Sequence, residues 1–376
     1  MKVSPVFHLV LFFTRGVSLQ TWERVGMLGR EVALYRELQR RGVKVSFITF
    51  GDHRDLHYAD RIPGIDIYCN RWHLPSALYE RWLSWLHRRV LRNCDIIKTN
   101  QTDGADLALG AARKFGKPLV ARCGYMWSEF AIRQLGADDA FVQHVLQAEA
   151  EVFAAADHVV VTTPMMAADI AERIPETAEK TTVIPNYVDI VAFAPGEVEK
   201  DIDLIFIGRI DPQKNVGLLL ESVQPLDCSL VIVGNGELRA DLMAQYGDLN
   251  GRLQWIDKLP NDEVPAYLRR ARVFVLPSHY EGHPKTLVEA MACGLPAIGT
   301  AVPGIQEVIT SGENGWLCGM EAEDIRAAIQ QLLGDADLRA KLGANARAYA
   351  LEHYALIKIA DRELALLQDL ISQVGA

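Results

Sequence analysis

Short apolar runs alternate with amphipathic stretches of helical length along most of the 376-residue chain. The runs at 6–13 and 272–277 are hydrophobic on both faces, which is typical of central strands in a parallel sheet. Residues 22–41 have helical spacing and are followed by Gly42, a residue that commonly ends helices. Because parallel strands need a crossover between them, this alternation predicts βαβ units and an α/β fold. Further strands are expected near 43–50, 95–99, 118–122, 158–162, 203–208, 229–234, 253–256 and 296–299.

The length of the chain and one irregular segment predict two domains. A chain of 376 residues is long for one hydrophobic core and comfortable for two. Residues 181–195 contain two prolines and show no clear periodicity, as expected of a domain boundary. We therefore expect an N-terminal domain over 1–190, a second domain over 191–355, and a final helix within 356–376.

Charge and cysteine usage exclude several classes of protein. Residues 1–190 carry 23 Lys and Arg against 22 Asp and Glu, and the remainder carries 16 against 26. Neither half is basic, which argues against a nucleic-acid partner. The six cysteines form no C-x-x-C pair, and no apolar stretch approaches the length of a membrane span. We expect a reduced, cytoplasmic protein without a signal peptide.

Two glutamates flank a tight turn after the apolar run 272–277. Glu281 lies on the loop at the carboxyl end of this strand, where open α/β sheets bind ligands. Gly282 and Pro284 predict the turn, and a helix is expected from Lys285 onward. Its first turn offers backbone N–H groups to a phosphate, and Glu289 lies one turn deeper. The pattern is that of a nucleotide-sugar site.

Two cations follow the expected strand 203–208. Arg209 and Lys214 lie five positions apart on a loop that also holds Gly208 and Pro212. Two fixed cations at a strand's carboxyl end suit a diphosphate and stabilise the charge that develops as it leaves. The alternative is a pair of solvated loop cations.

Four segments in the same order resemble the retaining family 4 glycosyltransferases. They are the two-glutamate stretch 281–298, the interdomain segment 183–189, the diphosphate-binding segment 206–215, and the loop 303–307. The resemblance is strong over 155–320 and weak before it. It implies a GT-B fold, in which two Rossmann-like domains with parallel sheets face each other across a cleft. It also implies that the last helix, roughly 356–373, crosses back to the first domain.

The resemblance implies a role for each residue of the second domain's loops. Glu281 would orient the transferred sugar, with Arg209 and Lys214 at the diphosphate, as the catalytic set. Glu289 would accept hydrogen bonds from the ribose hydroxyls. Lys285 replaces the apolar or small residue expected there, and either adds a phosphate or sugar contact or points to solvent. The full expected donor-binding set is Glu289, Gly16, Gly208, Gly234, Gly282, His283, Pro284, Lys285, Thr286, Leu287, Lys258 and Leu259.

Residues 231–237 begin like a dinucleotide-binding fingerprint, but Arg239 occupies the place of its third glycine. A hydride-transfer cofactor is therefore not expected. This segment either lines the nucleotide cleft or forms an ordinary turn, and the loop 257–260 is where the family reads the base. No Asp-x-Asp motif follows a strand of the second domain. We expect no metal and no cofactor, with a UDP- or GDP-sugar as the donor substrate.

In the first domain the resemblance is weaker. Gly16, in the loop 14–18, allows close approach of a phosphate, and the neighbouring Arg15 is a candidate to support it. Arg122 and Tyr125 stand where family members often place a histidine, and Cys123 has no apparent partner base that would make it a nucleophile. The expected acceptor-binding residues are Arg122, Tyr125, Asn100 and Gln101.

The segment from Tyr79 to Arg92 interleaves aromatic and aliphatic residues with four arginines. An aromatic, basic helix of this kind suits an anionic membrane surface beside a lipid-linked acceptor. The alternative is a helix packed on the domain with its arginines reaching solvent.

We therefore expect a retaining glycosyltransferase that moves a sugar from a nucleotide-diphosphate sugar to a glycan or lipid-linked glycan. A role in cell-surface polysaccharide synthesis follows from the resemblance, and the segment from Tyr79 to Arg92 suggests a place at the inner face of the membrane. Two alternatives stay open: a sugar-nucleotide epimerase of the same fold, and a non-catalytic sugar-binding or scaffolding partner in a glycan assembly complex.

Overall fold

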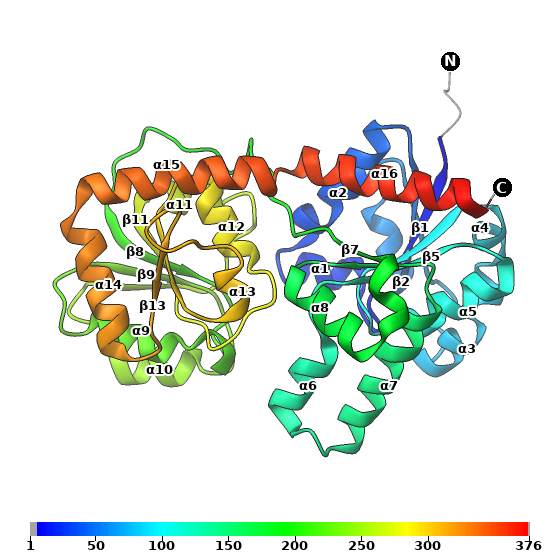
Figure 1. Ribbon diagram of the computed structural model, residues 1–376, viewed down its shortest axis with the longest axis horizontal. Coiled ribbons are helices and arrows are strands. Elements are labelled where there is room, and N and C mark those ends of the chain that lie inside the picture. Colours follow the sequence, from blue (N-terminus) through cyan, green and yellow to red (C-terminus); the bar gives the residue numbers. More distant parts are fainter. Residues whose placement is uncertain (1–5, 375–376) are drawn as a thin grey trace. The chain divides into compact units, whose positions relative to one another are not determined.

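The computed structural model describes residues 6–374, and the chain divides into two compact units (Figure 1). The N-terminal unit comprises Met1–Pro185 and Ile359–Ala376, and the C-terminal unit comprises Asn186–Lys358. Each unit has its own parallel sheet with helices packed against it, so the expected α/β class with two parallel sheets is confirmed.

The sheet of the N-terminal unit has seven strands in the order β3-β2-β1-β4-β5-β6-β7, and every neighbouring pair is parallel. The first strand, β1, is buried along its whole length, as expected for a strand at the centre of a doubly covered sheet. The strands are β1 (His8–Phe12), β2 (Lys44–Asp52), β3 (Ile65–Asn70), β4 (Ile96–Thr99), β5 (Leu119–Cys123), β6 (His158–Val161) and β7 (Thr181–Val183).

One expected helix of this unit is in fact two. The predicted helix 22–41 is divided into α1 (Leu19–Arg24) and α2 (Leu28–Arg40), because Gly26 adopts φ +74° between them. The other helices are η1 (His53–Tyr58), α3 (Ser76–Leu86), α4 (Arg88–Asn93), α5 (Ala105–Phe115), α6 (Trp127–Leu135), α7 (Ala140–Ala155), α8 (Pro164–Arg173) and η2 (Pro175–Lys180).

The last helix, α16 (Leu356–Val374), contributes its residues from Ile359 onward to the N-terminal unit. An ion pair between Lys98 of β4 and Glu363 of α16 is almost completely buried, with 0% and 2% of the two side chains exposed. Arg41, at the end of α2, forms a second ion pair with Asp361 at 2.8 Å. Polar contacts therefore fix the position of this helix on the unit.

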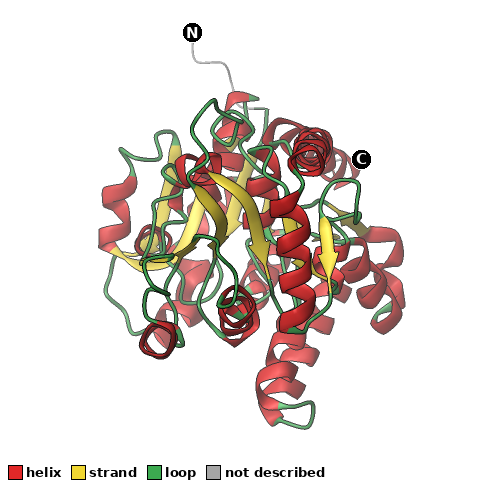
Figure 2. Cartoon of the chain, turned by 90° about the vertical axis from the view of Figure 1, so that its left-hand side faces the viewer, coloured by secondary structure: helices red, strands yellow, loops and turns green. Residues whose placement is uncertain are grey.

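The sheet of the C-terminal unit has six parallel strands in the order β10-β9-β8-β11-β12-β13, with helices around it (Figure 2). The strands are β8 (Ile202–Ile207), β9 (Leu230–Val233), β10 (Leu253–Ile256), β11 (Ala271–Leu276), β12 (Ala297–Thr300) and β13 (Trp316–Cys318). The helices are η3 (Pro212–Lys214), α9 (Val216–Val223), α10 (Arg239–Tyr246), α11 (Val264–Arg270), α12 (Lys285–Ala292), α13 (Pro303–Gln306), α14 (Ala322–Gly334) and α15 (Ala336–His353).

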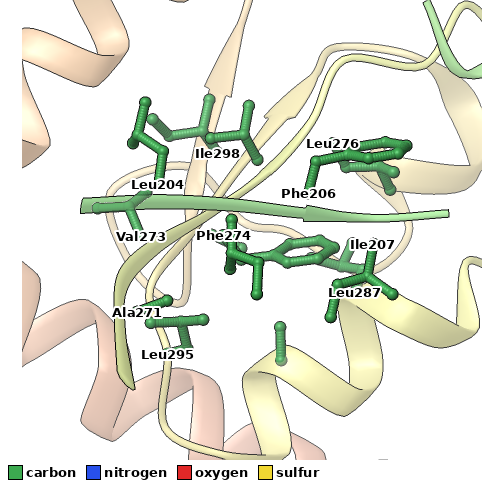
Figure 3. Packing of buried hydrophobic residues seen from close by; sticks show 14 of the residues in the cluster. Leu204, Phe206, Ile207, Ala271, Val273, Phe274, Leu276, Leu287, Leu295 and Ile298 are labelled. Carbon is green, nitrogen blue, oxygen red and sulfur yellow. The ribbon is translucent and has the colours of Figure 1, made fainter. Parts of the chain in front are cut away.

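Apolar side chains cover both faces of the central strands of this second sheet. Figure 3 shows Phe206 of β8 and Phe274 of β11 among neighbours that include Leu287 of α12. All three side chains are fully buried. The loops that leave these strands are therefore attached to a rigid base.

Three strands, β3, β7 and β13, were missing from the expectation. Strand β3 contains the exposed Asp66 and two half-buried positions, and it lies at the edge of its sheet. Strands β7 and β13 have three residues each and are also edge strands. Short, half-buried edge strands lack the continuous apolar run that marked the others.

Candidate active site

The loops that carry the expected catalytic residues leave two adjacent strands of the C-terminal sheet. Arg209 and Lys214 follow β8, and Glu281 follows β11. From β8 the chain continues to β9 on one side, whereas β11 lies on the other side of β8. This reversal of strand order is a topological switch point, and open α/β sheets bind ligands in the crevice at its carboxyl ends.

Lys214 and Glu281 meet across the switch point. The Lys214 Nζ lies 2.5 Å from Glu281 Oε1, and the two side chains are only 14% and 6% exposed. The Ser278 hydroxyl donates to the same carboxylate oxygen at 2.6 Å. Thr300, at the end of β12, donates its hydroxyl to the Ser278 carbonyl at 2.6 Å. A chain of contacts from three strands thus sets the position of the Glu281 carboxylate.

Gln213, which the sequence analysis did not single out, joins the two loops. Its side-chain amide donates to the Tyr280 main-chain carbonyl at 3.0 Å, and its main-chain carbonyl accepts from the His279 main-chain amide at 2.9 Å. Its Oε1 also accepts a hydrogen bond from Arg209 at 2.9 Å. The Arg209 side chain remains 67% exposed. Gln213, together with Asp211 at 3.2 Å, therefore directs a cation that solvent and an anionic ligand can reach.

Backbone groups of these loops approach each other where glycines stand. A Cβ at Gly234 would lie 1.8 Å from the Gly208 carbonyl oxygen, and a Cβ at Gly304 would lie 2.0 Å from that of Gly282. Neither separation is sterically allowed. The structure thus requires glycine at Gly234 and Gly304, because the loops after β8, β9, β11 and β12 touch through their main chains.

Glu289 lies on the inner side of α12. Its side chain is buried, and its Oε1 accepts a hydrogen bond from Asn261 Nδ2 at 3.1 Å. Asn261 lies in the loop after β10, two residues beyond Leu259. In the same loop, Lys258 is exposed and Leu259 is half-buried. This contact links the loop expected to read the base to the carboxylate expected to bind the ribose.

The residues around the start of α12 separate into two kinds. The Leu287 side chain packs in the core, and the His283 ring contacts the Tyr354 ring at a centroid distance of 5.0 Å. Lys285 and Thr286 are half-buried. His283 and Leu287 are therefore placed to offer a ligand main-chain groups, with their side chains used for packing.

The expected acceptor residues lie at the carboxyl edge of the other sheet, within the N-terminal unit. Arg122 donates to the Asn100 carbonyl at 3.0 Å, and the Gly124 amide donates to Gln101 Oε1 at 2.8 Å. The Tyr125 ring lies 5.0 Å from the Phe130 ring. Side chains after β4 and β5 are therefore brought together at one place on this unit.

Arg15, the candidate to support a phosphate at Gly16, already has anionic side-chain partners. Its guanidinium forms ion pairs with Glu80, Asp103 and Asp106. The neighbouring Gly16 adopts φ +72°, with open space where a Cβ would stand. Carboxylates of α3, α5 and the loop after β4 therefore surround the Arg15 guanidinium.

Cys123 does not have the properties of a nucleophile. It is fully buried and its thiol donates to the Tyr125 carbonyl at 3.0 Å. Burial raises the pKa of this thiol well above its ordinary value.

Among residues 6–374, one group of side chains could share a metal ion, namely Asp52, His53 and His73 of the N-terminal unit.

Comparison with known proteins identifies the family. The profile of the glycosyl transferases group 1 matches residues 189–349, and that of glycosyltransferase family 4 matches residues 32–191. The chain belongs to the family 4 glycosyltransferases. Enzymes of this family transfer a sugar from a nucleotide sugar, and the chain is therefore a glycosyltransferase.

Individual relatives agree with this assignment. A D-inositol 3-phosphate glycosyltransferase of Acidothermus cellulolyticus is 25% identical over 90% of this chain and 87% of its own length. The Escherichia coli UDP-Gal:alpha-D-GlcNAc-diphosphoundecaprenol alpha-1,3-galactosyltransferase is 30% identical, and the match spans 51% of this chain and 55% of that enzyme. Anabaena HepE in complex with UDP and glucose has a TM-score of 0.77 at 18% identity, covering 96% of this chain and 99% of HepE. This last likeness shows the shared GT-B fold.

Proposed function

We propose that this glycosyltransferase is a retaining, metal-independent hexosyltransferase that uses a UDP- or GDP-sugar. The observation that carries the proposal is the Lys214–Glu281 pair at the switch point, with Arg209 exposed beside it. The UDP in the HepE complex and the UDP-galactose in the name of the E. coli relative favour UDP.

The pair explains how the site would receive a diphosphate. Without an anionic ligand, Glu281 neutralises Lys214 where both side chains are largely buried. An arriving diphosphate offers Lys214 a second anionic partner, while Ser278 continues to hold the Glu281 carboxylate. Lys214 and Arg209 would stabilise the leaving group, and Glu281 would accept hydrogen bonds from the transferred sugar.

Retention would follow from front-face substitution. The acceptor hydroxyl attacks the anomeric carbon on the side from which the diphosphate departs. The bond between that carbon and the phosphate oxygen breaks, and the acceptor's proton passes to the departing diphosphate. The cations at the switch point supply the electrostatic stabilisation that this step needs.

We propose that the acceptor is a glycan or lipid-linked glycan of a cell-surface polysaccharide. The name of the E. coli relative contains a diphosphoundecaprenol-linked sugar. Arg122, Tyr125, Asn100 and Gln101 form a polar face of the N-terminal unit that suits hydroxyl groups. The donor and acceptor would thus be bound by different units.

An exposed aromatic patch supports a membrane-surface role for the same unit. The expected helix from Tyr79 to Arg92 is divided at His87 into α3 and α4. Its Tyr79 and Leu83 are buried, but Trp82 and Trp85 are 49% and 51% exposed. The Arg88 guanidinium lies 4.5 Å from the Trp85 ring. No helix among residues 6–374 is long and apolar enough to cross a bilayer.

Flotation with phosphatidylglycerol vesicles at low salt tests the membrane role. We expect the wild-type protein to float with the vesicles, and the double variant W82S/W85S to stay in solution. Binding that is equal for both proteins would contradict a role for this patch.

A transfer assay tests the proposed reaction. The enzyme is incubated with UDP-glucose, UDP-galactose, UDP-N-acetylglucosamine or GDP-mannose, with lipid-linked and free oligosaccharide acceptors, and with EDTA. We expect release of nucleoside diphosphate that depends on the acceptor, an axial product anomer by proton NMR, and loss of about 10²–10³-fold in Glu281→Gln. The surface variant Lys341→Ala should be unaffected.

Three results would overturn parts of the proposal. Conversion of a sugar nucleotide without an acceptor would indicate an epimerase. Loss of activity with EDTA would show metal dependence. Wild-type protein that releases no nucleoside diphosphate would favour a non-catalytic partner.

A further inference from the structure

We propose that a pocket between α5 and the α6–α7 hairpin binds the acceptor glycan beyond the sugar that receives the new residue. The inference rests on the proposed function, because it assumes a carbohydrate acceptor. It assigns this pocket to oligosaccharide rather than to phosphate or lipid.

The pocket is large and lies entirely within the N-terminal unit. Its volume is about 800 Å³, and it is lined by α5, by the loop after β4, and by α6 and α7. The helices α6 and α7 project together from the body of the unit (Figure 1). This volume lies in the upper part of the range of small-molecule sites.

One wall of the pocket carries two aromatic rings. Trp127 begins α6 and Phe141 lies in the first turn of α7, with ring centroids 5.8 Å apart and an interplanar angle of 75°. Phe141 is 47% exposed and Trp127 is half-buried. Exposed aromatic faces suit the apolar C–H face of a pyranose ring, whose edge carries the hydroxyl groups.

A buried carboxylate holds this aromatic wall in place. Glu149 of α7 is 1% exposed and accepts hydrogen bonds from the Ser128 hydroxyl at 2.5 Å and the Ser128 amide at 3.2 Å. Arg173 lies 3.6 Å from the same carboxylate. Because Ser128 follows Trp127, the start of α6 is fixed to α7. A preorganised ring pair loses little conformational entropy when a ligand binds.

The rest of the pocket lining is rich in hydrogen-bond acceptors. Arg15 is already paired with Asp103 and Asp106, which line the pocket, and with Glu80. Gln147 and Glu151 of α7 add further acceptors, and Arg113 of α5 adds a cation. Carboxylates keep several acceptor positions when one is used. With three carboxylates against two arginines, this lining suits the hydroxyls of a neutral sugar better than a phosphate.

The pocket adjoins the proposed acceptor residues along the chain. Thr102 lines the pocket and directly follows Gln101, and Trp127 lies two residues after Tyr125. The Gly124 amide ties the second segment to Gln101 at 2.8 Å. A glycan whose terminal sugar contacts Gln101 and Tyr125 can therefore extend into the pocket.

Saturation-transfer NMR with a defined panel of trisaccharides tests the inference. Maltotriose, cellotriose, chitotriose, α-mannotriose and α-1,3-linked galactotriose are offered to wild type, Trp127→Ala, Phe141→Ala and Leu135→Ala. Leu135 is an exposed residue of the same hairpin that does not line the pocket, so it provides a matched control. Binding of UDP and GDP is measured on the same samples by calorimetry.

We expect at least one trisaccharide to bind the wild type and Leu135→Ala, and to lose about fivefold or more of its signal in both aromatic variants. Nucleotide binding should be equal in all four proteins. The inference is overturned if no trisaccharide binds, or if binding persists in the aromatic variants. Should Trp127→Ala fail to fold by circular dichroism, Phe141→Ala decides alone. Failure of the wild type to bind either UDP or GDP would instead contradict the proposed function.

Discussion

The carboxyl edges of the two sheets are built in different ways. In the C-terminal unit, main-chain atoms of neighbouring loops touch at Gly234 and Gly304, and the charged Lys214 and Glu281 are nearly buried. In the N-terminal unit, the Arg15 amide donates to the Asp103 carbonyl at 3.1 Å, and the Arg15 side chain is shared among three carboxylates with part of its surface exposed.

This difference follows from what each edge would bind. A nucleotide diphosphate is a constant ligand, and a rigid set of main-chain groups and cations suits it. An acceptor glycan differs from one enzyme to another, and a face made of side chains can change without disturbing the sheet below. The comparison predicts that substitutions at the edge of the C-terminal sheet displace the backbone, whereas substitutions at the edge of the N-terminal sheet act locally.

The largest distortion of a main chain is expected for Gly234→Ala. Its new Cβ would meet the Gly208 carbonyl oxygen at 1.8 Å, so the loops after β8 and β9 must separate. We expect nucleotide binding to weaken by about tenfold or more by calorimetry. Gly217→Ala, on α9 of the same unit, meets only ordinary contact at 3.5 Å and should bind normally. Equal nucleotide affinity of Gly234→Ala and wild type would contradict the claim that main-chain contacts shape this edge.

The second prediction concerns the buried ion pair of the N-terminal unit. Glu363→Ala removes the carboxylate partner of the fully buried Lys98, which should lower the free energy of unfolding by about 3–5 kcal/mol. Asp361→Ala, which removes an exposed partner on the same helix, should cost about 0–1 kcal/mol. Chemical denaturation measures both variants. A cost for Glu363→Ala no greater than that for Asp361→Ala would show that this pair does not fix α16.

The third prediction is a pH dependence in the N-terminal unit. Burial, with a smaller effect of Arg71, lowers the pKa of His87 to about 4. The Tyr79 hydroxyl lies 2.8 Å from its ring nitrogen. The folded state disfavours the charged form of His87. The contribution of neutral His87 to the free energy of unfolding is therefore complete above pH 6.5, and it is lost as the pH falls toward 4. The loss is about 3 kcal/mol in total.

Denaturation of wild type and His87→Gln between pH 7 and pH 4 measures this contribution. The wild type should lose more stability over this range than the variant does. Identical slopes for the two proteins would mean that His87 is not kept neutral by the fold.

The smallest effect is expected for Gly16→Ala. Gly16 has φ +72°, but no atom lies within 4 Å of the new Cβ. The substitution should cost only the left-handed strain, about 1–2 kcal/mol. Gly110→Ala, in α5 with equally open surroundings, should be neutral or stabilising by about 0.5–1 kcal/mol. A loss of nucleotide affinity in Gly16→Ala as large as that in Gly234→Ala would remove the contrast between the two edges.

The same contrast explains what the sequence could predict. Central strands such as β8 and β11 are continuous apolar runs, and the sequence located them together with the loops that hold Lys214 and Glu281. The role of Gln213 was not evident, because a single glutamine in a loop carries no pattern until its contacts with Tyr280 and His279 are known.

The N-terminal unit was harder to predict for a physical reason. The aromatic pocket unites Trp127 and Phe141 with the loop after β4, and only the packing of α6 on α7 brings them together. The pairing of Arg15 with Glu80 likewise joins residues far apart in the chain. Such contacts depend on tertiary structure and leave no local signature.

The most direct test of the central claim is calorimetric binding of UDP, GDP, ADP and CMP, with EDTA present, to wild type, Lys214→Ala and Lys341→Ala. We predict that UDP or GDP binds the wild type and Lys341→Ala alike, and binds Lys214→Ala about 10- to 100-fold more weakly. Equal binding to all three proteins would contradict the claim that Lys214, at the switch point of the C-terminal sheet, holds the donor diphosphate.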